Sequence, residues 1–256
     1  MFVEMDKPKY YGSDAGKVIQ AIAIDVALTV PEICAITGLP KGSLQRILTN
    51  LSREQIVEKK SDEKYWVNRS LCQEYRNYHE WQKGEERRNK LIGFVEKWKE
   101  LKQLTGDSGV DHFFLDGRHL DSFIKDLIDH SENEVFVTNP YVQSCDLSDT
   151  LRDAAKRGRN VTLVTRHPED KFPENLEAKR KYHKTLVENS VAIKYNDKIH
   201  SKVILVDQAV AIVASMNFYS GSSAGVSLES GLATTRSSVV ESILAYASRI
   251  LEAKGE

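Results

Sequence analysis

The sequence has few cysteines, no long hydrophobic run and almost no net charge. Its three cysteines, Cys34, Cys72 and Cys145, are far apart and form no Cys-x-x-Cys pair, which indicates free thiols in a reducing compartment and no zinc site. The longest apolar stretches, such as residues 19–24, are too short to span a bilayer. The acidic N-terminus is atypical of a signal peptide. The sequence therefore predicts a cytoplasmic protein with no membrane partner. Its net charge of -1 neither favours nor excludes nucleic acid, because a neutral chain can carry a local basic face.

The first 70 residues predict a small helical domain that ends in a hairpin. Apolar residues recur at helical spacing over residues 15–28, a short helix follows from Pro31 to Gly38, and a third helix covers residues 41–53. Two strand-like segments then flank a turn, at residues 56–59 and 65–67. This order of elements is that of a winged helix-turn-helix. Over residues 14–70 the sequence resembles the DNA-binding domains of IclR-type and MarR-type regulators.

The resemblance implies that the third helix enters the major groove of duplex DNA. Its polar side carries residue types that can reach base edges and phosphates: Lys41, Ser43, Gln45, Arg46, Thr49 and Asn50. Three lysines on or beside the hairpin are expected to contact the DNA backbone: Lys59, Lys60 and Lys64. The alternative is that these side chains are only solvated and that the domain mediates protein contacts.

The rest of the chain predicts a charged helical linker at residues 71–109 and an α/β domain at residues 110–256. The linker lacks proline and has an apolar stripe from Leu91 to Leu104 at helical spacing. Strands and helices then alternate, which predicts a mixed sheet sandwiched between helices, an α-β-α arrangement. Strands are expected at residues 113–115, 134–138, 160–165, 192–194, 202–206, 209–214 and 229–234, and helices at 120–130, 147–156, 175–188 and from 237 onward.

Residues 199–217 carry side chains suited to phosphodiester chemistry. Apolar runs on either side of residues 207–208 predict a β-hairpin, and because strand residues two apart share a face, His200 and Lys202 are expected to project together. A two-residue turn would place His200 opposite Ser215. Lysine and asparagine donors can hold phosphate oxygens, and a neutral imidazole can attack phosphorus to form a covalent phospho-enzyme.

The pattern His-x-Lys, four residues, Asp, then Gly-Ser-x-Asn is the signature of the phospholipase D superfamily. The corresponding residues here are His200, Lys202 and Asp207, followed by Ala-Ser-Met-Asn at 214–217, with alanine in the place of the usual glycine. Residues 111–253 resemble the single-motif nucleases of this superfamily. The resemblance implies a catalytic set that consists of His200, Lys202, Asn217, Ser215, Glu229 and Asp207. Within this set, the glutamate would hydrogen-bond the catalytic histidine, and the aspartate would orient the hairpin.

The sequence contains a single His-x-Lys motif, whereas the superfamily mechanism uses two histidines, one as nucleophile and one as acid. The resemblance therefore implies a C2 homodimer through the phospholipase D-like domain, in which each copy contributes His200. Neither a metal nor a cofactor is expected, because fixed protein donors supply the electrostatic stabilisation.

Weaker candidates for the site lie after other strands. Tyr141 is expected either to line a pocket or to pack in the core, and Arg166 and His167 follow a strand end where α/β folds often bind ligands. The basic run at residues 179–184 is either a solvated face or a track for phosphates.

As a whole, the sequence predicts a DNA-binding, metal-independent endonuclease of the phosphodiesterase type. The alternative is a winged-helix transcription regulator whose phospholipase D-like domain senses a ligand. A lipid phosphodiesterase is disfavoured, because the chain has no membrane-binding stretch.

Overall fold

The chain forms two compact units that divide between Glu86 and Arg87. The structure is a computed structural model, and it describes residues 5–25, 27–60, 62–101, 111–169, 175–219 and 228–252. In these parts of the chain, no helix is both long enough and apolar enough to cross a membrane.

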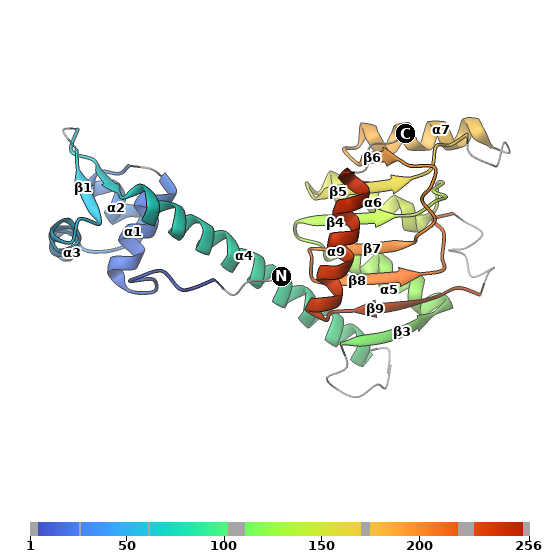
Figure 1. Ribbon diagram of the computed structural model, residues 1–256, viewed down its shortest axis with the longest axis horizontal. Helices are drawn as coiled ribbons and strands as arrows, with labels where there is room; N and C mark the ends of the chain where they lie inside the picture. Colours follow the sequence, from blue (N-terminus) through green and yellow to red (C-terminus); the bar gives the residue numbers. More distant parts are fainter. Residues whose placement is uncertain are drawn as a thin grey trace. The chain divides into compact units, whose positions relative to one another are not determined.

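The N-terminal unit is a winged helix-turn-helix, as predicted (Figure 1). Its elements are α1 (Asp14–Asp25), α2 (Val30–Thr37), α3 (Lys41–Arg53), β1 (Val57–Lys59) and β2 (Tyr65–Val67). Local signals set the limits of α2, because Glu32 accepts a hydrogen bond from the backbone N–H of Thr29 (2.7 Å) and Gly38 ends the helix at a left-handed φ of 69°. Leu28 forms an antiparallel bridge to Tyr65, which ties the segment before α2 to the hairpin.

The segment predicted as a linker is one continuous helix over its described residues, α4 (Arg69–Leu101). Tyr75 is fully buried in the core of the N-terminal unit, whereas Leu91, Val95 and Trp98 belong to the core of the C-terminal unit. The helix therefore supplies apolar side chains to both cores. The domain limits at residues 70 and 110 stay a prediction.

The C-terminal unit is an α/β sandwich around a seven-stranded mixed sheet, which confirms the predicted fold class. The strand order is β3-β9-β8-β7-β4-β5-β6; β4–β5 and β5–β6 are parallel pairs and the other neighbours are antiparallel. The strands are β3 (His112–Asp116), β4 (Glu134–Thr138), β5 (Asn160–Thr165), β6 (Ala192–Tyr195), β7 (Val203–Val206), β8 (Val210–Ala214) and β9 (Ser230–Thr234). The helices are α5 (Gly117–Asp129), α6 (Asp146–Lys156), α7 (Leu176–Glu188) and α9 (Ser237–Glu252).

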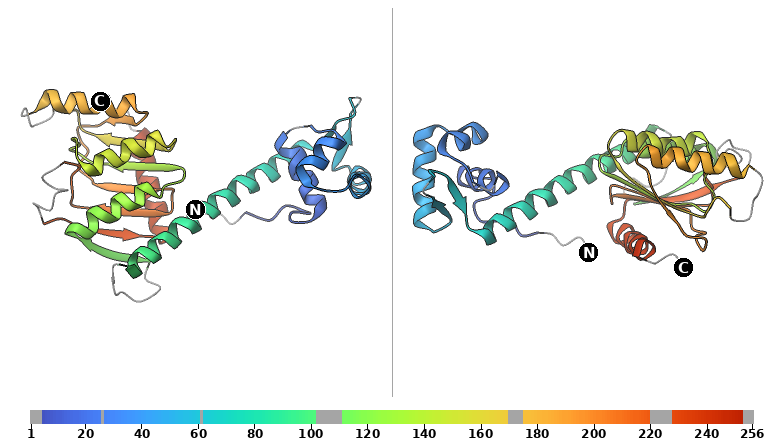
Figure 2. Two further views of the ribbon diagram at one scale, coloured as in Figure 1. Left: turned by 180° about the vertical axis from the view of Figure 1, so that it is seen from behind. Right: turned by 90° about the horizontal axis from the view of Figure 1, so that it is seen from above.

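Helices cover both faces of this sheet. Alternation along β4 sends Val135 and Val137 into the core under α5, α6 and α7, and sends Phe136 into the smaller core under α9. Figure 2 shows α9 on one face of the sheet and α6 and α7 on the other. The two layers hold the strands rigidly, so that the residues at the strand ends have fixed positions.

The hairpin of β7 and β8 has a different register from the predicted one. Val206 pairs with Val210 and Val203 with Val213, so three residues rather than two separate the paired ends of the strands. Asp207 has a left-handed φ of 49°, and its carboxylate accepts hydrogen bonds from the backbone N–H groups of residues 132–134 at 2.7, 2.8 and 2.8 Å. The prediction that His200 lies opposite Ser215 is wrong, because the extra loop residue shifts every pair by one position.

Candidate active site

The residues predicted to be catalytic gather where β7 begins and β8 ends. Because these strands are antiparallel neighbours, the segment before β7 and the segment after β8 meet at the same end of the two strands. His200 and Lys202 lie in the first segment, just before the strand rather than within it as predicted. Ser215 and Asn217 lie in the second segment. The backbone N–H of Ala214 donates to the carbonyl of Lys202 at 3.0 Å, which joins the two segments directly.

The segment that carries His200 is held by three side chains from other elements. Thr138 Oγ1 and Ser201 Oγ are hydrogen-bonded at 2.9 Å, and the hydroxyl of Tyr246 in α9 donates to the same serine oxygen at 2.7 Å. The guanidinium of Arg166 donates through Nε to the carbonyl of Ile199 at 2.7 Å. These bonds fix the backbone, while the side chain of His200 remains exposed to incoming ligands.

Lys202 is a half-buried cation beside that histidine. Its ammonium donates to the carbonyl of His200 at 3.3 Å. Burial lowers the pKa of Lys202, the carboxylate of Glu229 opposes this effect, and the charge of Arg166 adds to it. The charged form of Lys202 is therefore destabilised relative to water, and a bound anion such as a phosphate relieves this cost.

Ser215 and Glu229 form a pair on the neighbouring strand ends. The hydroxyl of Ser215 donates to the carboxylate of Glu229, which directly precedes β9, and accepts from the backbone N–H of Ser230 at 3.1 Å. The resemblance predicted instead that this glutamate holds the catalytic histidine. Within the described residues its hydrogen-bond partner is Ser215, and the carboxylate also stabilises the charge of Lys202.

Asn217 is positioned by a buried residue that the sequence reasoning missed. The side chain of Asn139 is fully buried, and its amide donates to the carbonyl of Met216 at 3.1 Å and accepts from the backbone N–H of Phe218 at 3.4 Å. Asn139 therefore hydrogen-bonds the backbone of both residues next to Asn217. Among the described residues, the buried amide oxygen of Asn217 has no hydrogen-bond partner. The signal in the sequence was a polar residue, followed by proline, directly after an apolar strand.

Asp207 lies at the other end of the hairpin from His200. The four residues of β7 lie between the two and by themselves span about 13 Å, taking the usual rise per strand residue. Its carboxylate is bonded to backbone N–H groups of residues 132–134. This geometry fits a residue that holds the hairpin in place and does not touch the substrate.

In the N-terminal unit, α3 exposes the predicted DNA-contacting side chains and buries Leu44, Leu48 and Leu51 on its opposite face. The exposed side chains are Lys41, Ser43, Gln45, Arg46, Thr49 and Asn50. The lysines of the hairpin are less available for contacts with the DNA backbone than the sequence predicts. Lys59 forms an ion pair with Glu63, and Lys60 one with Glu58 at 3.1 Å, while Lys64 is half-buried.

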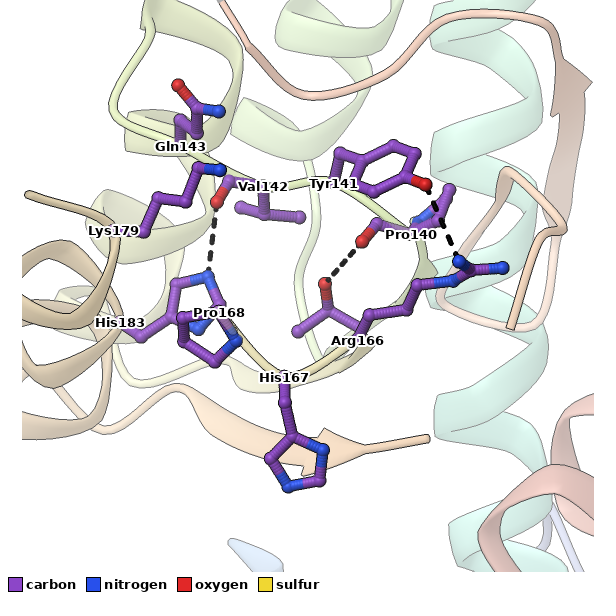
Figure 3. Close-up of a pocket in the computed structure, with 10 residues that line it drawn as sticks. Pro140, Tyr141, Val142, Gln143, Arg166, His167, Pro168, Lys179 and His183 are labelled. Carbon is purple, nitrogen blue, oxygen red and sulfur yellow. Dashed lines mark hydrogen bonds between the residues drawn. The ribbon is translucent and has the colours of Figure 1, made fainter. Parts of the chain in front are cut away.

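The weaker candidates of the α/β domain line a separate pocket near this site. Tyr141, Arg166 and His167 surround it together with Lys179 and His183 of α7 (Figure 3). In the basic run on α7, Lys179 is buried, whereas Arg180, Lys181 and Lys184 are exposed to solvent.

Comparison with known proteins places this fold in a family. Residues 124–251, half of the chain, match the family described as the cardiolipin synthase, PLD-like domain. The chain belongs to this phospholipase D-like family. Residues 16–61 match the IclR helix-turn-helix domain, so the protein combines a phospholipase D-like domain with a helix-turn-helix domain. None of the curated protein sequences matches the chain.

Several solved structures are similar to the chain at low sequence identity. Nuc from Salmonella typhimurium, a phospholipase D family member, is 17% identical over 54% of this chain and 93% of its own, with a TM-score of 0.47. NucT from Helicobacter pylori is 13% identical over 55% of this chain and 95% of its own, with a TM-score of 0.45. TrmBL2, an archaeal chromatin protein, is 14% identical over 93% of this chain and 92% of its own, with a TM-score of 0.42.

Proposed function

We propose that the protein is a DNA-binding, metal-independent phosphodiesterase, an endonuclease that acts as a homodimer through its phospholipase D-like domain. One observation supports this proposal: the His200–Lys202 segment and the Ser215–Asn217 segment meet at the shared end of β7 and β8. The Ala214–Lys202 hydrogen bond joins the two segments. A nucleophile, a cation and amide and hydroxyl groups are the parts that phosphodiester cleavage requires.

The chemistry takes two steps and uses a histidine from each copy. In the first step, an imidazole nitrogen of His200 forms a bond to phosphorus, the bond to the leaving oxygen breaks, and the partner's His200 gives that oxygen a proton. In the second step, water attacks phosphorus, the N–P bond breaks, and the partner's His200 takes the proton from the water. Lys202 and Asn217 hold the charged phosphate oxygens throughout.

An exposed apolar row beside the site supports the pairing of two copies. Phe114 of β3, Leu232 of β9 and Val213 of β8 lie opposite one another in register, and their side chains are 64%, 50% and 49% exposed. Leu228, next to Glu229, is fully exposed. Monomeric proteins rarely leave such a continuous apolar row in water. We assign the row, which lies on the same face of the sheet as Ala211 and the core under α9, to the contact with a second copy.

In this proposal the N-terminal unit supplies DNA affinity. The exposed side of α3 carries Lys41 and Arg46 beside Gln45 and Asn50, a set that suits phosphates and base edges in the major groove of duplex DNA. The unit therefore holds DNA while the phospholipase D-like domain cleaves it.

The decisive experiment incubates the full chain with plasmid DNA, and separately with single-stranded DNA, in the presence of EDTA. We expect cleavage, and we expect His200→Ala to reduce its rate by about 10²–10⁴-fold for the general-acid role alone. Because His200 is exposed, the substitution leaves the fold intact, which circular dichroism checks. Sequence-specific DNA binding without cleavage by the unmodified chain would contradict the proposal and identify a ligand-sensing regulator instead.

A further inference from the structure

His200 is an exposed residue between two anchored neighbours. Ile199 is 5% exposed and belongs to the core under α9, together with Leu205 of β7. On the other side of the histidine, Ser201 accepts a hydrogen bond from Tyr246 of α9. Figure 1 shows that helix lying across the strands of the sheet. The position of the exposed imidazole therefore depends on contacts that its two neighbours make with α9.

Three hydroxyl groups around Ser201 form a chain of hydrogen bonds with one consistent direction. Tyr246 donates to Ser201 Oγ at 2.7 Å, and Ser201 Oγ lies 2.9 Å from Thr138 Oγ1. Thr138 Oγ1 donates to the carbonyl of Ser201 at 3.2 Å and accepts from the backbone N–H of Val203 at 3.2 Å. A hydroxyl carries a single proton, so the bond between the two Oγ atoms must use the proton of Ser201. Tyr246 thus donates to Ser201, Ser201 to Thr138, and Thr138 back to the Ser201 backbone.

The chain of hydroxyls lies in a partly dry environment. Thr138 is fully buried, Ser201 is half-buried, and the ring of Tyr246 packs against the core under α9. A buried hydroxyl that loses its partner has little water to replace it, so the bonded arrangement is favoured over looser ones. The hydrogen bonds therefore restrict both the side chain and the backbone of the residue that follows His200.

Thr138 and the next residue, Asn139, hold the two halves of the candidate site from the end of one strand. Thr138 is the last residue of β4 and bonds Ser201, whereas Asn139 bonds the backbone on both sides of Asn217. Both side chains are fully buried. Because the two residues are adjacent, a single peptide unit sets the spacing between the half that carries His200 and the half that carries Asn217.

We propose that Tyr246 is a positioning residue: through Ser201 it orients the backbone that carries His200, so that α9 sets the direction from which the imidazole meets phosphorus. This role rests on the proposed function and deepens it, because it places part of the catalytic geometry outside the His-x-Lys motif. Attack needs the reacting atoms about 3–3.5 Å apart and aligned, and a misplacement of about 1 Å can cost about a hundredfold in rate. Tyr246 itself does not touch the substrate.

Turnover of bis(p-nitrophenyl) phosphate by the full chain with Tyr246→Phe tests this role. The substitution removes one oxygen and keeps the ring in its place against the core. We expect kcat to fall by about tenfold to a hundredfold while KM changes by less than about twofold, because Lys202 and Asn217 still hold the phosphate. The matched control is Ser242→Ala, which removes a hydroxyl of α9 that donates to the carbonyl of Ser238 within the helix, and it should leave both constants unchanged.

Two substitutions of Thr138 test the other end of the chain of hydroxyls. Thr138→Val keeps the shape of the side chain and loses its hydroxyl, and it should lower kcat as Tyr246→Phe does. Thr138→Ser keeps the hydroxyl and should retain most of the rate. Equal losses with valine and serine would show that packing at the end of β4 matters and the hydroxyl does not, which would overturn the role. Circular dichroism checks that each variant is folded.

A measurement without turnover separates a failure of this role from a failure of the proposed function. The Cε1–H signal of His200 in NMR spectra, identified by its loss in His200→Ala, reports the surroundings of the imidazole. Tyr246→Phe should shift this signal, and Ser242→Ala should not. An unchanged signal or an unchanged kcat in Tyr246→Phe would overturn the positioning role. If the unmodified chain hydrolyses no phosphodiester, the nuclease is refuted, and the shift of the signal alone decides whether Tyr246 orients His200.

Discussion

Replacing Asp207 by asparagine separates a role in holding the hairpin from a role in the chemistry. One carboxylate oxygen accepts from the backbone N–H groups of Asn133 and Glu134, both at 2.8 Å, and the other accepts from Glu132 at 2.7 Å. Asparagine keeps the shape and tolerates the left-handed backbone at this position. Its amide oxygen can replace the first carboxylate oxygen, but its NH₂ group then faces a backbone N–H, so one bond is lost and the others are weakened.

The expected cost of Asp207→Asn is about 3 kcal/mol. A hydrogen bond to a charged group contributes about 1.5–3 kcal/mol, and an unsatisfied buried donor adds to the loss. The measurement is urea unfolding followed by the fluorescence of Trp98, which is buried in the core of this unit, after Trp66→Phe and Trp81→Phe have removed the other tryptophans. With a typical slope of about 2 kcal/mol per molar urea, the midpoint should fall by about 1–2 M.

Two results would refute this reasoning. An unchanged midpoint would show that the three hydrogen bonds contribute little. A normal midpoint together with a large loss of turnover at low temperature would place the carboxylate in the chemistry. The matched control is Asp129→Asn, which removes a half-exposed ion pair with Arg157 (3.2 Å) and should cost less than about 0.5 kcal/mol.

Three further predictions concern assembly, DNA binding and pH. Leu232→Glu places a charge in the exposed apolar row and should convert the dimer to an inactive monomer in sedimentation velocity, whereas Leu251→Glu on α9 should not; an active monomer would contradict this. Arg46→Ala should weaken duplex binding in fluorescence anisotropy and make the fall of log K with log salt concentration shallower by about 0.9. Lys59→Ala should have a smaller effect, because Glu63 already pairs with this lysine. Equal effects would argue against α3 as the main contact with DNA. Burial lowers the pKa of His183 below 6.5, so the unfolded chain takes up a proton below pH 6.5 that the folded chain does not. The free energy of unfolding should therefore fall as the pH drops from 6.5 through the folded-state pKa, and His183→Gln should flatten that fall in urea titrations; identical pH slopes for both proteins would count against it.

Much of the fold could be predicted because its signals are local. The limits of α2 follow from Thr29, Glu32 and Gly38, which are adjacent to the helix they terminate. The third helix was predicted at residues 41–53 and is observed there, since Leu44, Leu48 and Leu51 repeat with the period of a helix. The strands of the α/β domain were found in the same way, from short apolar runs bounded by turns. The family could be recognised because its motif is also a local pattern.

The details of the site were harder to predict, because they depend on residues far apart in the chain. Asp207 and Gln208 are not typical turn residues, and the loop conformation depends on backbone donors at residues 132–134, more than seventy positions away. The two-residue turn was therefore a wrong prediction. Glu229 was expected to contact a histidine, but the end of β8 places Ser215 against it.

By itself, the sequence determined the order of the elements, the two kinds of domain and the segment that carries the His-x-Lys pattern, because periodicity, capping residues and short motifs act over a few neighbouring residues. Only the tertiary structure decided which side chains meet at the shared end of β7 and β8, that Lys59 and Lys60 of the hairpin are ion-paired, and that Lys179 faces a pocket while Lys181 faces solvent. These features arise when strands and helices from distant parts of the chain pack together, and burial and charge then depend on neighbours that no local pattern specifies.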